Sequence, residues 1–227
     1  MTVLRAESVT RPRPVIVWGA RGHAKVLNEF LRPLGYQVVA IFDNDPEATS
    51  PLADVPVFHG STGFDHWRET CPHQGVQSLV AIGGQRGKVR CDIQERLATF
   101  GIEPLTAIHP RAFVADGAII GAGSQCLAHS SVGTEAVLGR ACIVNTNASV
   151  DHESVLGNGV HVAPGATITG CVEIGDFSMI GAGAVVLPRI RIGRNVSIGA
   201  GAVVTRDIPD DKVAYGNPAK IIRDNVP

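Results

Sequence analysis

The residues best suited to chemistry are three consecutive polar side chains, Asp151, His152 and Glu153. A carboxylate beside an imidazole fixes the tautomer of the ring and raises its basicity, which is the usual arrangement of a general base. The alternative is a solvated turn with no catalytic role. Asn145 and His161 are two further polar candidates, although an isolated histidine is more often an ordinary surface residue.

A six-residue repeat carries all of these residues. From Val114 to Val204, every sixth residue is Val, Ile or Leu, except for Cys126. A period of six fits neither an amphipathic helix nor an alternating strand, and is typical of a hexapeptide β-helix. Three hexads close one coil, and successive coils stack at about 4.8 Å. The repeat therefore predicts an all-β parallel β-helix.

Residues 18 positions apart stack in columns on successive coils of such a fold. His152 takes an outward position, and Gly170 lies one coil along, where the missing side chain leaves a slot beside the imidazole. Ala182 and Ala200 form another column of small residues. Small residues stacked in this way make a groove for a long, thin ligand such as a pantetheine arm.

The first part of the chain is expected to form a small α/β unit with a Rossmann-like parallel sheet. An apolar strand over residues 15–18 leads into a Gly-Ala-Arg-Gly-His turn, a helix over 24–34 and a second strand that ends at Asp43. A third strand ends at Gly83. Ligands of open α/β sheets bind at the carboxyl ends of the strands, so these ends are candidates for binding a nucleotide or a sugar. The turn lacks the full GxGxxG pattern, and a purely structural turn is an equal alternative.

We divide the chain into four segments: a flexible leader (1–14), the Rossmann-like domain (15–108), the β-helix domain (109–211) and a C-terminal cap (212–227). Residues 44–70 contain three prolines and are expected to be irregular. The last residues are expected to pack as a short helix or strand over the final coil.

Composition excludes several classes of protein. The net charge of −1 and the pI of about 6.7 argue against nucleic-acid binding, and no apolar run approaches the length of a membrane span. The five cysteines are an odd number without a CxxC pair, which favours reduced thiols and a cytoplasmic location. Three histidines, His59, His66 and His73, have no supporting acid or cysteine cluster, and we expect no metal.

The chain resembles the sugar O- and N-acyltransferases of the bacillosamine and sialic acid O-acetyltransferase type. The resemblance covers about residues 15–222 and rests on seven segments in order: GARGH (19–23), AIG (81–83), VNT (144–146), VDHE (150–153), VH (160–161), VLP (186–188) and GNPAK (216–220). It implies a left-handed β-helix, a homotrimer with acetyl-CoA between adjacent β-helices, and an N-terminal domain that binds a nucleotide-linked sugar.

The resemblance also implies roles for individual residues. His152 would be the general base and Glu153 its orienting carboxylate. Four residues would lie near acetyl-CoA: His161, Gly170, Ala182 and Ala200. Seven would bind the sugar substrate: Arg21, Gly22, His23, Asp43, Asn44, Gly83 and Asn145.

The expected reaction is acetyl transfer from acetyl-CoA to the amine of a nucleotide-linked amino sugar, for bacterial surface-glycan biosynthesis. The alternative within the family is O-acetylation of a sugar hydroxyl, as in sialic acid. Two other classes stay open at this point: a non-catalytic β-helix scaffold, and a metal-dependent β-helix of the carbonic-anhydrase kind.

Overall fold

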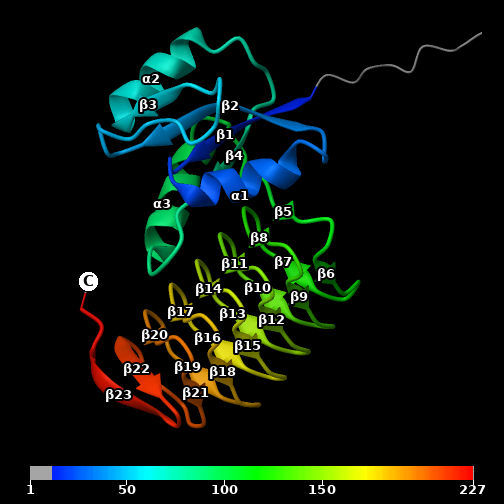
Figure 1. Ribbon diagram of the computed structural model, residues 1–227, viewed down its shortest axis with the longest axis vertical. Helices are drawn as coiled ribbons and strands as arrows, with labels where there is room; N and C mark the ends of the chain where they lie inside the picture. The colour runs from blue at the N-terminus through cyan, green and yellow to red at the C-terminus, as the bar shows by residue number, and fades with distance from the viewer. Residues whose placement is uncertain (1–11, 227) are drawn as a thin grey trace, which may run out of the picture.

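The computed structural model describes residues 12–226, which form two parts in contact with one another (Figure 1). An α/β unit lies at one end, and a parallel β-helix with three flat faces forms the rest. The predicted fold class, a Rossmann-like α/β domain followed by a left-handed β-helix, is confirmed. No helix among residues 12–226 is long and apolar enough to cross a lipid bilayer.

The α/β unit has a four-stranded parallel sheet with the strand order β3-β2-β1-β4. Its elements are β1 (Arg13–Trp18), α1 (Gly22–Leu31), β2 (Tyr36–Asp43), β3 (Val57–His59), α2 (Gly60–Thr70), β4 (Gln77–Val80) and α3 (Gly87–Ala98). Alternate residues of β1 enter two separate cores: Val15 and Val17 pack with α1, whereas Ile16 and Trp18 pack with α2 and α3. Burial on both faces is the usual state of a parallel sheet.

The structure differs from the sequence prediction in three places. β1 begins at Arg13, inside the expected leader, of which residues 1–11 lie outside the described part of the chain. α1 ends at Leu31 rather than at residue 34. Residues 44–56 are irregular as predicted, but the prediction is wrong for residues 57–70. The prolines all precede β3, and Phe64 and Trp67 then give α2 a buried face.

The β-helix consists of two-residue strands that build three faces. Face 1 contains β5 (Ala107–Ile108), β8 (Gln125–Cys126), β11 (Ile143–Val144), β14 (His161–Val162), β17 (Met179–Ile180) and β20 (Ser197–Ile198). Face 2 contains β6 (Phe113–Val114), β9 (Ser131–Val132), β12 (Ser149–Val150), β15 (Thr167–Ile168), β18 (Val185–Val186) and β21 (Val203–Val204). Face 3 contains β7 (Ile119–Ile120), β10 (Val137–Leu138), β13 (Val155–Leu156), β16 (Glu173–Ile174) and β19 (Arg191–Ile192).

The interior of the β-helix is filled by the aliphatic residues of the repeat. Each strand pairs in parallel with the strand 18 residues along, so that Val144 lies beside Val162 and Val150 beside Ile168. These side chains are 1% exposed or less, and burying each one contributes about 1.5–3 kcal/mol relative to exposure. Cys126 also points inward, and its burial raises the pKa of the thiol to about 12.

A hairpin of two strands closes the C-terminal end. β22 (Lys212–Gly216) pairs in parallel with β20 and extends face 1, and β23 (Ala219–Asp224) returns antiparallel to β22. Ala214 is fully buried against the last coil, and Ala219 packs on the same core. This hairpin covers an otherwise open end, as a β-helix requires.

The α/β unit is fastened to the β-helix by a buried arginine. Arg90 of α3 is 0% exposed and donates hydrogen bonds to the carbonyl oxygens of Ala141 (3.0 Å), Gly159 (2.6 Å) and Ile82 (3.1 Å). Burial lowers the pKa of Arg90 to about 10, so it stays charged at neutral pH. A Cβ at Gly87 would lie 2.3 Å from the Gly159 oxygen, which shows how closely α3 approaches the coil.

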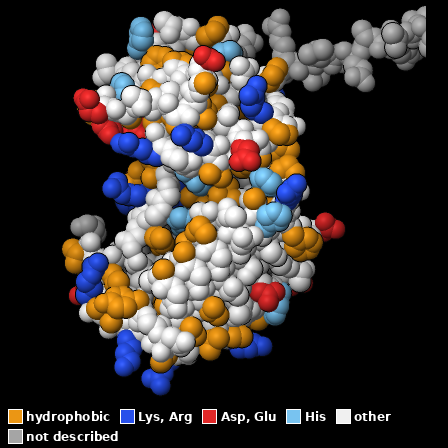
Figure 2. All heavy atoms as spheres, viewed as in Figure 1, with side chains coloured by type: hydrophobic (Ala, Val, Ile, Leu, Met, Phe, Trp, Pro, Cys, Tyr) orange, Lys and Arg blue, Asp and Glu red, His pale blue; other side chains and the backbone are white. Residues whose placement is uncertain are grey.

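Apolar packing continues across the same contact. Leu27 and Leu79 of the α/β unit belong to one buried cluster with Leu127 and Ile143 of the β-helix. The two parts therefore share a core, and the carboxyl ends of β1 and β4 are held against face 1. Figure 2 shows histidine side chains along the narrowing between the two parts.

Candidate active site

The side chains of His152 and Glu153 contact each other at the corner between faces 2 and 3. His152 Nδ1 lies 3.0 Å from Glu153 Oε2. This hydrogen bond is the main reason that the pKa of Glu153 lies below its usual value, with a smaller contribution from the Cys171 thiol. Asp151 instead accepts the backbone N–H of His152 (2.7 Å) and holds the turn. Glu153, not Asp151, is therefore the carboxylate that orients the ring.

The other nitrogen of the same ring points at Gly170. A Cβ placed on Gly170 would lie 2.4 Å from His152 Nε2, far inside contact distance. Only glycine leaves room for the imidazole in this orientation. With Nδ1–H donated to Glu153, the Nε2 atom carries the lone pair and is able to accept a proton.

A second set of predicted residues lines a cavity of about 410 Å³ at the carboxyl ends of β1, β2 and β4. The set includes Arg21, His23, Asp43, Asn44 and Gly83. Five further lining side chains were not predicted as site residues: Trp18, Ala81, Ile82, Arg86 and Val89. Gly22 begins α1 and is not part of the lining. Trp18, Ala81 and Ile82 lie next to predicted turns, Arg86 lies in the loop after Gly83, and Val89 lies in the first turn of α3. Their positions in the sequence therefore carried only a weak signal.

Two polar side chains of this cavity are already engaged. Asp43 accepts the backbone N–H groups of Ala20 (2.8 Å) and Asp45 (3.0 Å), and so fixes the turn after β1. His23 Nε2 lies 2.6 Å from the side-chain oxygen of Gln125 on face 1. Burial lowers the pKa of His23, which makes the neutral ring a donor to Gln125 and leaves Nδ1 with a lone pair.

His161 lies beneath the turn after β4 rather than at the surface. It is 5% exposed, its Nδ1 lies 3.0 Å from the backbone nitrogen of Gly84, and its Nε2 lies 3.1 Å from Asn145 Nδ2. Burial, helped by the charge of Arg90, lowers the pKa of His161 to about 4, so the ring is neutral. The alternative considered for His161, an ordinary surface histidine, is wrong because the α/β unit covers face 1.

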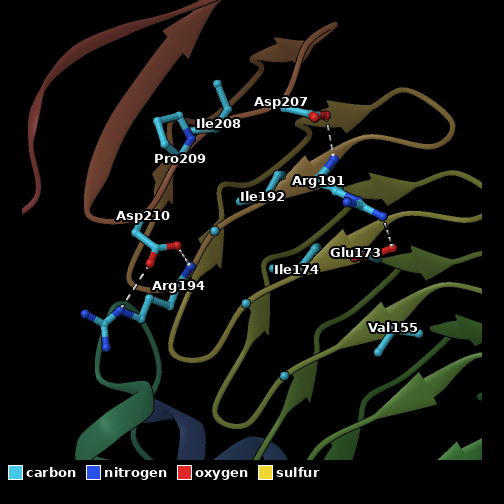
Figure 3. A pocket seen from close by; sticks show the side chains of 13 residues that line it. Val155, Glu173, Ile174, Arg191, Ile192, Arg194, Asp207, Ile208, Pro209 and Asp210 are labelled. Atoms are coloured by element: carbon cyan, nitrogen blue, oxygen red, sulfur yellow. Dashed lines mark hydrogen bonds and ion pairs between the residues drawn. The ribbon is translucent and has the colours of Figure 1, made fainter.

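Face 3 carries a groove of about 710 Å³ near the C-terminal end of the β-helix (Figure 3). Its charged side chains pair with each other: Arg191 with Glu173 at 3.2 Å and Arg194 with Asp210 at 3.3 Å. None of the predicted site residues lines it. The candidate sites are therefore the His152 corner and the cavity of the α/β unit.

Comparison with known proteins shows the family of the chain. Residues 14–97 match the PglD N-terminal domain family, and residues 171–206 match the bacterial transferase hexapeptide family of six repeats. The acetyltransferase domain of PglB from Neisseria gonorrhoeae FA1090 is 36% identical, with a TM-score of 0.81 over 92% of this chain and 100% of that chain. The chain belongs to the PglD-type sugar acyltransferases.

Two further structures extend the comparison. PerB from Caulobacter crescentus, solved with CoA and GDP-perosamine, is 35% identical, with a TM-score of 0.84 over 92% of this chain and 97% of that chain. WeeI from Acinetobacter baumannii AYE is 27% identical, with a TM-score of 0.81 over 92% of this chain and 100% of that chain. No curated protein matches the chain. As a PglD-type sugar acyltransferase the protein is an enzyme, which removes the scaffold and carbonic-anhydrase alternatives.

In this acyltransferase the predicted site residues outside the α/β unit, apart from His161 on face 1, lie on two corners of the β-helix. His152 and Gly170 lie between faces 2 and 3, whereas Asn145, Ala182 and Ala200 lie between faces 1 and 2. The two alanines are exposed, and their corner is a regular ladder in which Gly201 N donates to the Ala182 oxygen (2.8 Å). The repeat places these residues in separate columns, but a single chain does not show how the columns of different copies meet.

Proposed function

We propose that the enzyme transfers the acetyl group of acetyl-CoA to the amine of a nucleotide-linked amino sugar, with His152 as the general base. The observation that carries the proposal is the His152 ring, held at Nδ1 by Glu153 and free at Nε2 beside Gly170. The ligands of the relatives support it: the PglB domain has been solved with acetyl coenzyme A, and PerB with CoA and GDP-perosamine.

In the proposed reaction the sugar amine attacks the thioester carbonyl and passes a proton to His152 Nε2. The carbonyl electrons move onto oxygen, then re-form the C=O bond as the CoA thiolate leaves and is protonated by the imidazolium. Glu153, whose lowered pKa keeps it ionised, stabilises the imidazolium. General base assistance of this kind is worth about 10²–10⁴-fold in rate.

Gly170 is suited to a second role in this scheme. Its backbone N–H donates no hydrogen bond within residues 12–226, while its carbonyl oxygen accepts from Arg189 (3.2 Å). An unengaged N–H beside His152 is able to donate to the oxyanion of the tetrahedral intermediate. Such a donor contributes most where it is already oriented before the reaction.

A homotrimer completes the proposed site. The outward residues of face 2 are uncharged along five coils (Ser131, Ser149, Thr167, Val185 and Val203), whereas the outward row of face 3 includes Glu173 and Arg191. A flat uncharged face suits contact with further copies of the chain. Three copies with face 2 toward a common axis bring the corner of His152 next to the partner subunit's Ala182 and the partner subunit's Ala200.

In this arrangement acetyl-CoA lies between adjacent β-helices, along Gly170 of one chain and the small-residue corner of the next, with His161 near its reactive end. The sugar nucleotide occupies the cavity of the α/β unit, lined by Arg21, His23, Asp43, Asn44 and Gly83 with Gly22 and Asn145 nearby. The proposed setting is the cytoplasm, and the proposed role is bacterial surface-glycan biosynthesis.

Complementation between two inactive variants tests the shared site. His152→Ala removes the base, and Ala182→Trp blocks the groove. The Ala182→Trp chain keeps the base, and the His152→Ala chain keeps the groove. In mixed trimers an intact site forms wherever the base of the first variant lies next to the groove of the second, which random mixing produces at about a quarter of the sites. Recovery of activity on mixing supports the trimeric site; the absence of recovery from two folded variants contradicts it.

The acceptor is tested with acetyl-CoA and a panel of UDP-, GDP- and dTDP-linked amino sugars together with CMP-sialic acid. Transfer to an amine gives a product that is stable to mild alkali, whereas O-acetyl esters are cleaved. An alkali-stable product identifies the proposed N-acetyltransferase, and an alkali-labile product identifies the O-acetyltransferase alternative.

A further inference from the structure

A third potential ligand atom lies beside the His152–Glu153 pair. The sulfur of Cys171 is 3.6 Å from Glu153 Oε2, the same oxygen that lies 3.0 Å from His152 Nδ1. The nitrogen, oxygen and sulfur atoms all lie within 4.8 Å of one another. Glu153 and His152 are exposed and Cys171 is half-buried, so an ion in solution reaches all three atoms.

The β-helix itself fixes this grouping. Glu153 and Cys171 are 18 residues apart and occupy the same position of the corner on adjacent coils. Both have left-handed backbones, with φ of +56° and +59°, so their side chains leave the corner in parallel. The backbone nitrogen of Cys171 donates to the His152 oxygen (2.9 Å), which locks the two coils together at this point.

The distances from Glu153 Oε2 to the other two atoms are close to those around one tetrahedral ion. Zinc bonds of about 2.0–2.2 Å to nitrogen and oxygen and about 2.3 Å to sulfur put neighbouring ligands about 3.3 Å apart for N and O and about 3.6 Å apart for S and O. The observed separations are 3.0 Å and 3.6 Å. A set with one imidazole and one thiolate favours Zn²⁺, Co²⁺ or Cd²⁺ over Mg²⁺ and Ca²⁺, which prefer oxygen.

We infer that His152 Nδ1, Glu153 Oε2 and Cys171 Sγ form a binding site for a thiophilic divalent cation, and that its occupation switches off acetyl transfer. The inhibitory part rests on the proposed function of His152. A cation on Nδ1 uses the lone pair of that nitrogen, and the ring proton moves to Nε2. The Cys171 thiol loses its proton to solvent. A ring protonated at Nε2 has no lone pair to accept the proton of the sugar amine.

Cobalt titration tests the site without any measurement of activity. We expect the full chain to bind about one Co²⁺, with the near-ultraviolet absorption of a cobalt–thiolate bond. Cys171→Ala should lose this band. Cys71→Ala is the matched control, because Cys71 is also a half-buried free thiol but lies in the α/β unit, and it should keep the band. No thiolate band in the wild type, or an unchanged band in Cys171→Ala, overturns the site.

Zinc inhibition tests the consequence. Product formation is followed by chromatography in chelator-buffered Zn²⁺, since a thiol-release assay would be disturbed by zinc bound to CoA. We expect wild type and Cys71→Ala to be inhibited and restored by EDTA, and Cys171→Ala to need at least about tenfold more Zn²⁺ for the same inhibition. Mg²⁺ at the same concentration should not inhibit acetyl transfer. Equal zinc sensitivity of Cys171→Ala, or activation by zinc, contradicts the inference.

The two experiments separate the possible failures. If no acceptor is acetylated, the proposed function fails while the cobalt titration still decides whether the cation site exists. If acetyl transfer proceeds but the thiolate band is absent, the function stands and the cation site fails.

Discussion

The imidazole of His152 occupies the space that a side chain on Gly170 would fill, since a Cβ there would lie 2.4 Å from His152 Nε2. The two residues are one coil apart, and the 18-residue spacing of the β-helix brings them together. The position of the proposed general base is thus set by the missing side chain of Gly170 on the neighbouring coil.

Gly170→Ala should therefore displace the imidazole without unfolding the chain. The backbone of Gly170 is not left-handed, so alanine costs little strain there. We expect kcat to fall at least about tenfold, because a displacement of about 1 Å at a reacting group is enough to lose this much rate. Steady-state kinetics measure the effect.

Gly117→Ala is the matched control for this substitution. A Cβ at Gly117 meets Thr134 Oγ1 at 3.4 Å, an ordinary contact. This variant should keep full activity. A normal kcat for Gly170→Ala would show that the slot has no part in positioning the base.

Arg90→Met should weaken the contact between the α/β unit and the β-helix. Three carbonyl oxygens lose a charged donor, and those of Ala141 and Gly159 stay buried. We expect a loss of about 3–5 kcal/mol in the free energy of unfolding, measured by urea titration. Lys88→Met, on the exposed side of the same helix, should leave the urea midpoint unchanged. Equal midpoints for both variants would contradict the role of Arg90.

His161 should make the stability of the protein depend on pH. Its pKa is lowered to about 4 in the folded chain from 6.5, so the unfolded state binds a proton first as the pH falls. The contribution of His161 is fully present above about pH 6.5 and declines between there and pH 4. Between pH 7.5 and 5.0 the loss is about 2 kcal/mol for this group.

Urea titrations at the two pH values test this prediction. His161→Gln removes the titrating group and should reduce the pH dependence of the unfolding free energy. His66→Gln, which changes an exposed histidine of α2, should leave that dependence as in the wild type. A His161→Gln protein with the full wild-type pH dependence would show that other groups cause it.

The β-helix was predictable from the sequence because its register is local. One aliphatic residue in every six fixes which side chains point inward, and an offset of 18 then fixes neighbours such as His152 and Gly170. The same offset of 18 residues places Glu153 next to Cys171. This pair was not predicted, although the spacing is evident in the sequence. The strand ends that line the cavity of the α/β unit were also predictable, since Gly and Asp follow apolar runs there.

The contact between the two parts was not predictable. The burial of His161 and Arg90 depends on which face of the β-helix meets α3, and a repeat that treats its three faces alike carries no such information. An isolated histidine and a helix arginine have the sequence signature of surface residues. They are buried because each finds hydrogen-bond partners across the contact, Gly84 for His161 and the carbonyl oxygens of Ala141 and Gly159 for Arg90.

The central claim is that His152 is the general base, and turnover of His152→Ala with the accepted sugar nucleotide tests it most directly. Acetyl-CoA affinity, measured in parallel by calorimetry, shows whether the donor still binds. The account predicts that kcat falls at least about 10²-fold while acetyl-CoA binds as in the wild type. Turnover within a few-fold of the wild type would contradict it.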